Sequence, residues 1–277
     1  MAIPVWQDNA MGSDSVTWDP AKYVEFGDFR DRPFFDLTGR IRAEAPRAVV
    51  DLGCGPGTLT ATLARRWPEA DVLGVDSSKH MISEANGHYV GANRPGNLSF
   101  VLSNIKKWTP NARTEVVVSN AALQWVPGHQ ELMAGWLGGM SDGAWLAVQV
   151  PGNFRSPSHA LMRELAGSPR WSKQLDGVLR HDDAVWEPDA YHELLLRAGC
   201  RADVWETTYN QLLTGESPVL NWVRGTALRP VLDALDADEA AVFEADYAAL
   251  LDDAYPAGDF GTVFPFRRLF MVGQKHA

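Results

Sequence analysis

The sequence predicts an α/β fold built on a mostly parallel β-sheet, and three observations support this prediction. An apolar run at 49–52 breaks into a glycine-rich loop at 53–57, and the segment that follows has helical periodicity. A second apolar run at 72–75 then ends in Asp76. Further apolar runs alternate with helical segments along the rest of the chain. Because strand, glycine turn, helix, strand and acid form a nucleotide-binding unit, the sheet is expected to be Rossmann-like.

The glycine-rich loop has the properties that a nucleotide site requires. Gly53 and Gly55 can adopt positive φ angles and let a ligand approach the backbone closely. The helix that follows presents unpaired N–H groups and the positive end of its dipole. Asp76 lies 19 residues beyond Gly57, close to the spacing of about 20 residues expected of a carboxylate that binds ribose hydroxyls. The loop and Asp76 are therefore predicted to bind a nucleoside cofactor.

The details of the loop distinguish between two kinds of cofactor. Thr58 stands where a dinucleotide-binding loop has its third glycine, and Asp51 precedes the first glycine by two residues. A carboxylate at this point would crowd a pyrophosphate but would suit a cationic amine. The pattern from Asp51 to Gly57 resembles the signature of class I S-adenosylmethionine-dependent methyltransferases. A loop that binds NAD(P) is the alternative at this point.

Composition and charge limit the partners of the chain. Its 277 residues suffice for one α/β domain with insertions, and 45% of them are hydrophobic. A net charge of −10 disfavours nucleic acid as a partner, since phosphate binding needs clustered Lys and Arg. No apolar run approaches the roughly 20 residues of a membrane span, and the only cysteines are Cys54 and Cys200. A reduced cytoplasmic protein without membrane contact is therefore expected.

The N-terminal region is predicted to hold a flexible leader and two helices. Residues 1–17 lack the basic and apolar regions of a secretory signal and are expected to form the leader. The first helix begins after Asp19 as its N-cap, with Pro20 at its first position. Gly27 is expected to open a short loop that lasts until a second helix over 34–42. In methyltransferases of this class such helices often fold over the cofactor.

The rest of the chain continues the alternation of strands and helices. Further strands are expected at 98–101, 115–120, 144–150, 200–208 and 267–272, and helices at 79–86, 132–137, 157–165 and 191–198. Helical insertions near 153–189 and 210–260 are expected to form a lid. This order suits a seven-stranded sheet whose last strand is antiparallel. Residues 18–277 are therefore predicted to form one methyltransferase domain.

Several residues at the ends of the predicted strands are candidates for contacts to the cofactor. Methyltransferases commonly place an Asp after the third strand to accept from the adenine amino group, and here Asn104 offers its amide oxygen instead. Ile105 is expected to lie against the adenine, and Asn120 ends the fourth strand at the edge where ligands bind. The residues predicted to bind the cofactor are Asp51, Gly53, Cys54, Gly55, Gly57, Asp76, Ser77, Met81, Asn104, Ile105 and Asn120.

Methyl transfer to a carboxylate would make particular demands on the protein. A carboxylate is ionised at pH 7 and needs no general base, but it needs arginines and hydroxyl donors to hold it. The sequence contains no Cys/His cluster for a metal. The side chains predicted to contact such an acceptor are Tyr23, Arg30, Arg32, Trp125, His129, Tyr209, Arg224, Arg229 and Arg268.

From about Trp18 to the C-terminus, the chain resembles the family of trans-aconitate 2-methyltransferases. The resemblance rests on YVEFGDFRDRP at 23–33, the glycine-rich stretch at 49–58, VDSSKHM at 75–81, SNAALQWVP at 119–127, His129, WETTY at 205–209 and LRP at 228–230. It implies a cytoplasmic enzyme that forms a monomethyl ester of trans-aconitate, a small polycarboxylate. The cofactor would be S-adenosylmethionine, and the coproduct S-adenosylhomocysteine.

Three features depart from the pattern of that family. Asn104 replaces the usual Asp, a leader precedes Trp18, and residues are added within 170–183. The first bears on cofactor affinity and the last on the fit of the substrate. A phenol or an amine as the methyl acceptor is therefore the alternative, and the protein is expected to be a monomer or a weak homodimer.

Overall fold

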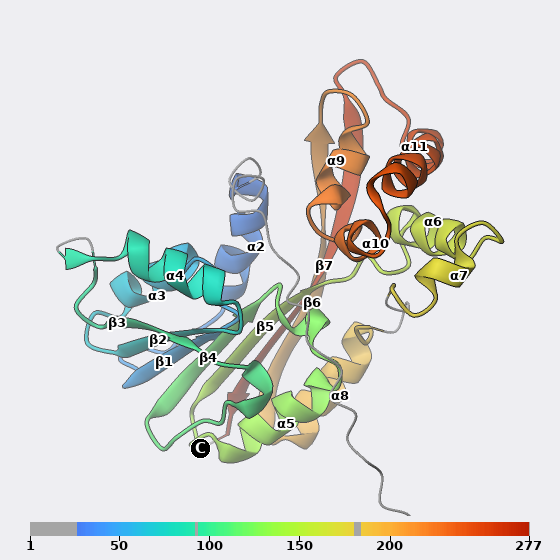
Figure 1. The fold of residues 1–277 in the computed structure, drawn as a ribbon. Helices are drawn as coiled ribbons and strands as arrows, with labels where there is room; N and C mark the ends of the chain where they lie inside the picture. Colours follow the sequence, from blue (N-terminus) through green and yellow to red (C-terminus); the bar gives the residue numbers. More distant parts are fainter. Residues whose placement is uncertain (1–26, 92–93, 180–183, 277) are drawn as a thin grey trace, which may run out of the picture.

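The computed structural model describes residues 27–91, 94–179 and 184–276, with only the backbone for residues 27–30. The predicted leader, the predicted first helix and Tyr23 lie outside this described part. Within it, a seven-stranded β-sheet carries helices on both faces, and a further group of helices lies to one side of the sheet (Figure 1).

The strand order of the sheet is β3-β2-β1-β4-β5-β7-β6. The strands are β1 (Ala48–Leu52), β2 (Asp71–Asp76), β3 (Leu98–Leu102), β4 (Thr114–Asn120), β5 (Trp145–Pro151), β6 (Cys200–Leu213) and β7 (Thr262–Lys275). β1 pairs in parallel with both β2 and β4, so the winding of the chain changes direction between these two neighbours. β7 runs antiparallel to β5 and β6. The predicted mostly parallel sheet with an antiparallel last strand is thus confirmed.

Helices flank the sheet in layers. They are α2 (Gly27–Thr38), α3 (Thr58–Arg66), α4 (Lys79–His88), α5 (His129–Gly139), α6 (Pro157–Ala166), α7 (Ser172–Leu175), α8 (Pro188–Arg197), α9 (Pro218–Arg224), α10 (Arg229–Ala234) and α11 (Ala237–Ala254). α2 and α3 pack Phe34 and Leu63 against one face, whereas α5 and α8 pack Met133 and Tyr191 against the other. Among the described residues, no helix combines the length and the apolar character needed to cross a bilayer.

The structure corrects the prediction for the segment before β1. The sequence predicts a loop at 27–33 and a helix over 34–42, but α2 includes the whole of that loop and ends at Thr38. Burial of Phe34 on the sheet outweighs the poor helix propensity of glycine and proline in this segment. The Arg66 guanidinium donates to the carbonyl of Thr38 at 2.7 Å and satisfies the end of the helix.

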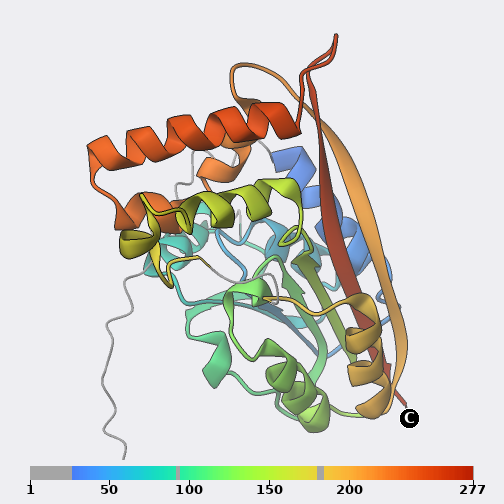
Figure 2. The same cartoon turned by 90° about the vertical axis from the view of Figure 1, so that its right-hand side faces the viewer.

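β6 and β7 are longer than the sequence predicts. They pair antiparallel over their full lengths, whereas strands are expected only at 200–208 and 267–272. Their extra residues project beyond the neighbouring strands as a two-stranded ribbon (Figure 2). Leu213 and Phe264 on one face of this ribbon are buried beneath helices, and this burial stabilises a ribbon that would be marginal alone.

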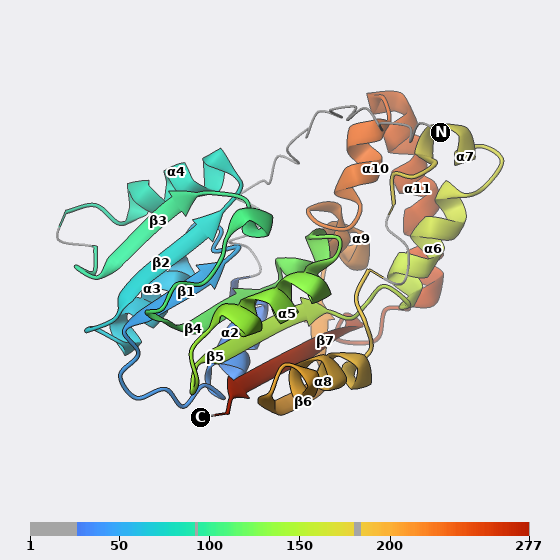
Figure 3. The same cartoon turned by 90° about the horizontal axis from the view of Figure 1, so that it is seen from below.

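Five helices form a cap around the ribbon. α6, α7, α9, α10 and α11 gather beside its outer end, to one side of the sheet (Figures 1 and 3). They share a hydrophobic core of their own, which includes Trp222 of α9, Phe243 and Tyr247 of α11 and Phe264 of β7. The cap derives from the two insertions that the sequence predicts near 153–189 and 210–260.

Candidate active site

A pocket opens where the carboxyl ends of β1 and β4 meet the glycine-rich loop. α2 and α4 provide its other walls. We call it the glycine-loop pocket, and it is lined by Asp31, Phe34, Asp51, Gly53, Cys54, Gly55, Pro56, Thr58, Leu59, Met81, Glu84, His88 and Asn120. It lies at the switch point of the sheet, the place where open α/β sheets bind their ligands.

The glycines of the loop serve two different purposes. Gly53 has a φ angle of +83°, and a Cβ atom there would lie 2.2 Å from the Cβ of Ala122. Gly55 also has a positive φ, of +54°, but a Cβ atom there would meet nothing within 4 Å. Gly53 is therefore required by packing, whereas the bare backbone of Gly55 leaves room for a ligand in the pocket. Gly57, with a φ of +79°, forms the N-cap of α3.

The carboxylates of Asp51 and Asp76 lie next to the glycine-rich loop. Asp51 is buried, and the Thr60 hydroxyl donates to it at 2.6 Å. Burial raises the pKa of Asp51 to about 7; the hydrogen bond from Thr60 opposes this shift, and the charge of Asp76 adds to it. The Asp76 carboxylate accepts from the N–H of Gly55 at 3.0 Å and from that of Ser78 at 2.8 Å. Asp76 thus connects the loop to the start of α4.

The other residues predicted to bind the cofactor divide into two groups. Cys54 and Met81 are buried and line the glycine-loop pocket. Burial raises the pKa of the Cys54 thiol, which stays protonated at neutral pH. Those that lie outside the lining are Gly57, Asp76, Ser77, Asn104 and Ile105. The Asn104 amide oxygen accepts from the N–H of Lys106 at 2.9 Å and caps a short 3-10 helix.

Sequence reasoning missed several residues of this pocket. Glu84 lies three residues after Met81 on α4, so helical spacing from the predicted Met81 could have found it. Asp31 and Phe34 reach the pocket from α2. Because the sequence predicts a loop at 27–33, it does not indicate that Asp31 lies on a helix beside the pocket.

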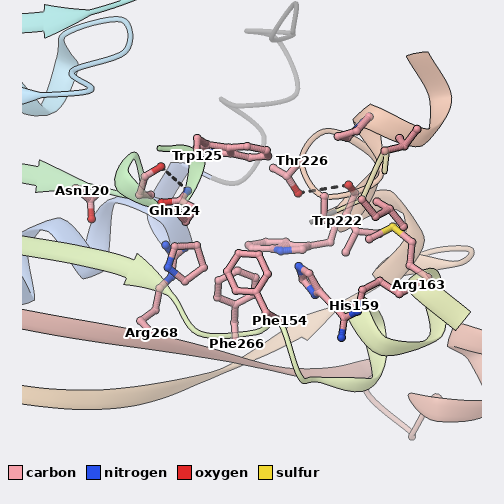
Figure 4. A pocket seen from close by; sticks show the side chains of 18 residues that line it. Asn120, Gln124, Trp125, Phe154, His159, Arg163, Trp222, Thr226, Phe266 and Arg268 are labelled. Carbon is pink, nitrogen blue, oxygen red and sulfur yellow. Dashed lines mark hydrogen bonds between the residues drawn. The ribbon is translucent and has the colours of Figure 1, made fainter. Parts of the chain in front are cut away.

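A second pocket shares Asn120 with the first. It lies between the carboxyl ends of β4 and β5, the middle of β7 and the cap helices α6 and α9 (Figure 4). We call it the aromatic pocket, and it is lined by Asn120, Ala121, Gln124, Trp125, Pro151, Phe154, His159, Met162, Arg163, Val178, Leu179, Trp222, Val223, Thr226, Ala227, Pro230, Phe266 and Arg268. Because Asn120 lines both pockets, ligands bound in them would meet at this residue.

The aromatic pocket has polar groups at both ends and aromatic rings between them. Figure 4 shows Asn120 and Arg268 at one end and His159 and Arg163 at the other. The rings of Trp125, Phe154, Trp222 and Phe266 lie in the space between these ends. Such a lining favours a ligand with separated polar groups and limits the access of water.

Arg268 is held firmly at the end nearest Asn120. Its side chain is buried on β7, and Nη1 donates to the Gln149 Oε1 at 3.2 Å. The guanidinium carbon lies 4.5 Å from the centroid of the Phe266 ring. Gln149 is itself fully buried on the neighbouring β5. Of the side chains predicted to contact an acceptor, Trp125 and Arg268 line this pocket.

Arg32 and Tyr209 come together at another place. The Tyr209 hydroxyl donates to the Asp36 carboxylate at 2.6 Å. Arg32 lies 3.7 Å from the same carboxylate, with its guanidinium carbon 5.1 Å from the centroid of the Tyr209 ring. Burial raises the pKa of Tyr209, and its bond to Asp36 adds to this shift. The three residues fasten α2 to β6 and line neither pocket; of Arg30, only the backbone on α2 is described.

Two more predicted arginines belong to the cap and lie outside the pocket lining. The Arg224 Nε is 2.5 Å from Glu244, and the Arg229 Nε is 2.9 Å from Asp233. A carboxylate of the chain therefore compensates each guanidinium. In their place, the neighbouring residues Val223 and Pro230 line the aromatic pocket.

The structure places His129 among buried residues of two helices. Its side chain is buried between α5 and α8, where Nε2 lies 2.7 Å from the Tyr191 hydroxyl. Nδ1 lies 3.1 Å from the carbonyl oxygen of Val126. Burial lowers the pKa of His129, which keeps the ring neutral. His129 therefore joins two helices and is not among the residues that line the aromatic pocket.

His159 and Arg163 are pocket residues that sequence reasoning missed. Both stand on α6, four residues apart, so they share one face of the helix. This spacing is visible in the sequence after Ser156-Pro157, which begin the helix. The spacing alone, however, does not indicate that this face of the helix points toward the β-sheet.

The two pockets differ in the sign of their charged residues. Within the described part of the chain, the glycine-loop pocket is lined by the acids Asp31, Asp51 and Glu84 and by no Lys or Arg. Of the residues that the structure describes, Arg163 and Arg268 line the aromatic pocket, and no Asp or Glu does. Adjacent sites of opposite sign suit a cationic ligand beside an anionic one, despite the net charge of −10.

Comparisons with known proteins show the family and the fold to which the chain is similar. Residues 49–137 match the family described as "Methyltransferase domain". The YcgJ protein from Bacillus subtilis has a similar fold, with a TM-score of 0.59, 12% sequence identity and coverage of 89% of this chain and 99% of that one.

Curated relatives match almost the whole chain. Trans-aconitate 2-methyltransferase from Streptomyces coelicolor is 53% identical over 96% of this chain and 89% of its own length. The protein of the same name from Rhodococcus jostii is 52% identical over 93% of this chain and 99% of its own length. The chain therefore belongs to the trans-aconitate 2-methyltransferase family.

Proposed function

We propose that this protein transfers a methyl group from S-adenosylmethionine to one carboxylate of trans-aconitate or a closely related small polycarboxylate. The products would be a monomethyl ester and S-adenosylhomocysteine. The observation that carries the proposal is the pair of pockets of opposite charge that meet at Asn120. The names of the curated relatives, at about half identity, supply the substrate class.

The residues of the glycine-loop pocket fit S-adenosylmethionine. The open side of Gly55 is the cradle that a Cβ would fill, and Asp51 and Glu84 offer carboxylates to a cationic ligand. When bound there, S-adenosylmethionine would supply the methyl group that a carboxylate oxygen accepts, and the electron pair of the broken carbon–sulfur bond would stay on the sulfur. Asn120, at the boundary of the pockets, would face the methyl group.

The aromatic pocket would align the acceptor. Arg268 can hold a carboxylate through charged hydrogen bonds, because Gln149 and Phe266 fix its guanidinium at the end nearest Asn120. An ionised carboxylate has no proton to lose, so no side chain of the pocket has to act as a base. The protein then has to orient the acceptor oxygen and exclude water. In well-oriented systems, orientation can lower the activation barrier by about 7–11 kcal/mol.

Incubation of the purified protein with S-adenosylmethionine and trans-aconitate tests the proposal. Mass spectrometry should detect the acceptor with one added CH2 unit together with S-adenosylhomocysteine. Arg268→Gln should raise the KM for trans-aconitate about 10- to 100-fold, since a charged hydrogen bond is lost, and leave the KM for S-adenosylmethionine nearly unchanged. Arg229→Gln is the matched control, because Asp233 compensates that arginine outside the pocket. Methylation of phenols or amines but not of trans-aconitate would contradict the proposal.

A further inference from the structure

We propose that Arg163, with His159 beside it, forms a second carboxylate subsite at the cap end of the aromatic pocket. This subsite would hold a carboxylate that does not react, while Arg268 holds the carboxylate that is methylated. The inference rests on the proposed function and assigns the choice of polycarboxylates over monocarboxylates to a residue of the cap.

The position of Arg163 meets the requirement for such a subsite. Arg163 and His159 lie on one face of α6, and both line the pocket. Figure 4 places them across the aromatic rings from Asn120 and Arg268. A ligand that spans the pocket therefore meets a cationic group at each end, whereas a short monocarboxylate can reach only one.

The electrostatic surroundings of Arg163 set it apart from the other arginines of the cap. Arg224 lies 2.5 Å from Glu244, Arg229 lies 2.9 Å from Asp233, and Arg170 lies 3.8 Å from Asp246. Arg163 is half-buried, and among the described residues no carboxylate pairs with it. A guanidinium that lines a pocket and has no paired carboxylate among the described residues favours an anionic ligand, because binding replaces lost hydration with charged hydrogen bonds.

The apolar middle of the pocket explains why two anchors are needed. Phe154, Trp222 and Phe266 offer van der Waals contact to the carbon skeleton of the acceptor but cannot fix its direction. A second anchor would orient the molecule so that one carboxylate reaches Asn120. Loss of this anchor should weaken acceptor binding more than it slows a correctly bound acceptor.

Steady-state kinetics of wild type, Arg163→Gln and Arg163→Lys test the subsite. Arg163→Gln removes the charge and should raise the KM for trans-aconitate about 10- to 100-fold, with kcat within about threefold and the KM for S-adenosylmethionine unchanged. Arg163→Lys should recover part of the loss, because the charge returns without the guanidinium geometry. Arg170→Gln is the control, since Arg170 lies on the cap outside the pocket, and should keep the wild-type KM.

Acceptor selectivity gives a second readout that does not depend on the stability of a variant. Wild type should prefer trans-aconitate to crotonate, an unsaturated monocarboxylate, in kcat/KM, and Arg163→Gln should reduce this preference. An active wild type with an unchanged KM in Arg163→Gln would overturn the subsite and leave the proposed function standing. A wild type that fails to methylate trans-aconitate would overturn the proposed function and the subsite with it.

Discussion

At the residue scale, Asp51 is a buried carboxyl group beneath the glycine-rich loop, and burial raises its pKa to about 7. The folded protein therefore binds this proton more tightly than the unfolded chain, where the pKa is near its usual value. The stabilisation is complete at low pH and is lost as the pH rises through 7. The same loss of the proton creates the anion that a cationic ligand needs.

Asp51→Asn should remove this pH dependence. From about pH 8 to about pH 6, the free energy of unfolding of the ligand-free wild type should gain about 1 kcal/mol from this group. Thermal unfolding of both proteins at the two pH values measures the effect, and the variant should lack that gain. Equal changes in wild type and variant would exclude Asp51 as the titrating group.

Alanine at Gly53 and at Gly55 should have different effects. At Gly53 the new Cβ would overlap Ala122, so we expect a loss of stability of about 1–3 kcal/mol. At Gly55 the new Cβ has open space, so the loss should be about 1 kcal/mol from the positive φ, while affinity for S-adenosylhomocysteine falls. Chemical denaturation and calorimetric titration separate the two results. Tight ligand binding by Gly55→Ala would show that the ligand does not approach this glycine.

At the scale of elements, α2 connects the glycine-loop pocket to the long strand β6. It contributes Asp31 and Phe34 to the pocket, and Tyr209 holds it through the hydrogen bond to Asp36. If this attachment is weakened, the lining residues should shift in the pocket, because one helix holds both the attachment and the lining residues.

Tyr209→Phe tests this coupling. Loss of the bond to the Asp36 carboxylate should destabilise the protein by about 1–3 kcal/mol, and affinity for S-adenosylhomocysteine should fall severalfold. Tyr255→Phe is the control, because the Tyr255 hydroxyl accepts from the N–H of Ser158 within the cap. It should lower stability without changing that affinity. An equal loss of affinity in both variants would mean that the effect is global.

Elements with a local sequence signal could be predicted, and elements that depend on distant partners could not. One contiguous stretch of sequence predicts β1, the glycine-rich loop and α3. The N-cap residue of α4, Ser78, is likewise a local signal. The outer part of the β6–β7 ribbon depends on burial of Leu213 and Phe264 beneath the cap. The start of α2 depends on packing of its apolar side against the sheet, which overrides Gly27 and Pro33.

At the scale of the whole molecule, the glycine-loop pocket draws on residues between 31 and 120, whereas the aromatic pocket is assembled from segments that lie farther apart in the sequence. The aromatic pocket draws on β4, β5, β7, α6 and α9, so residue type alone could not identify its members. The arginines illustrate this limit, because acids of the chain pair with most of those predicted. For Arg32 and Arg229 the partner stands four residues later, a spacing that the sequence already displays.

A crystal structure with S-adenosylhomocysteine and trans-aconitate bound together tests the central claim most directly. The sulfur should lie in the glycine-loop pocket, one carboxylate on Arg268 and another on Arg163, with Asn120 beside the direct path from the sulfur to the nearer carboxylate. Trans-aconitate bound away from both arginines, or a side chain that separates the sulfur from the nearer carboxylate, would contradict the proposed arrangement.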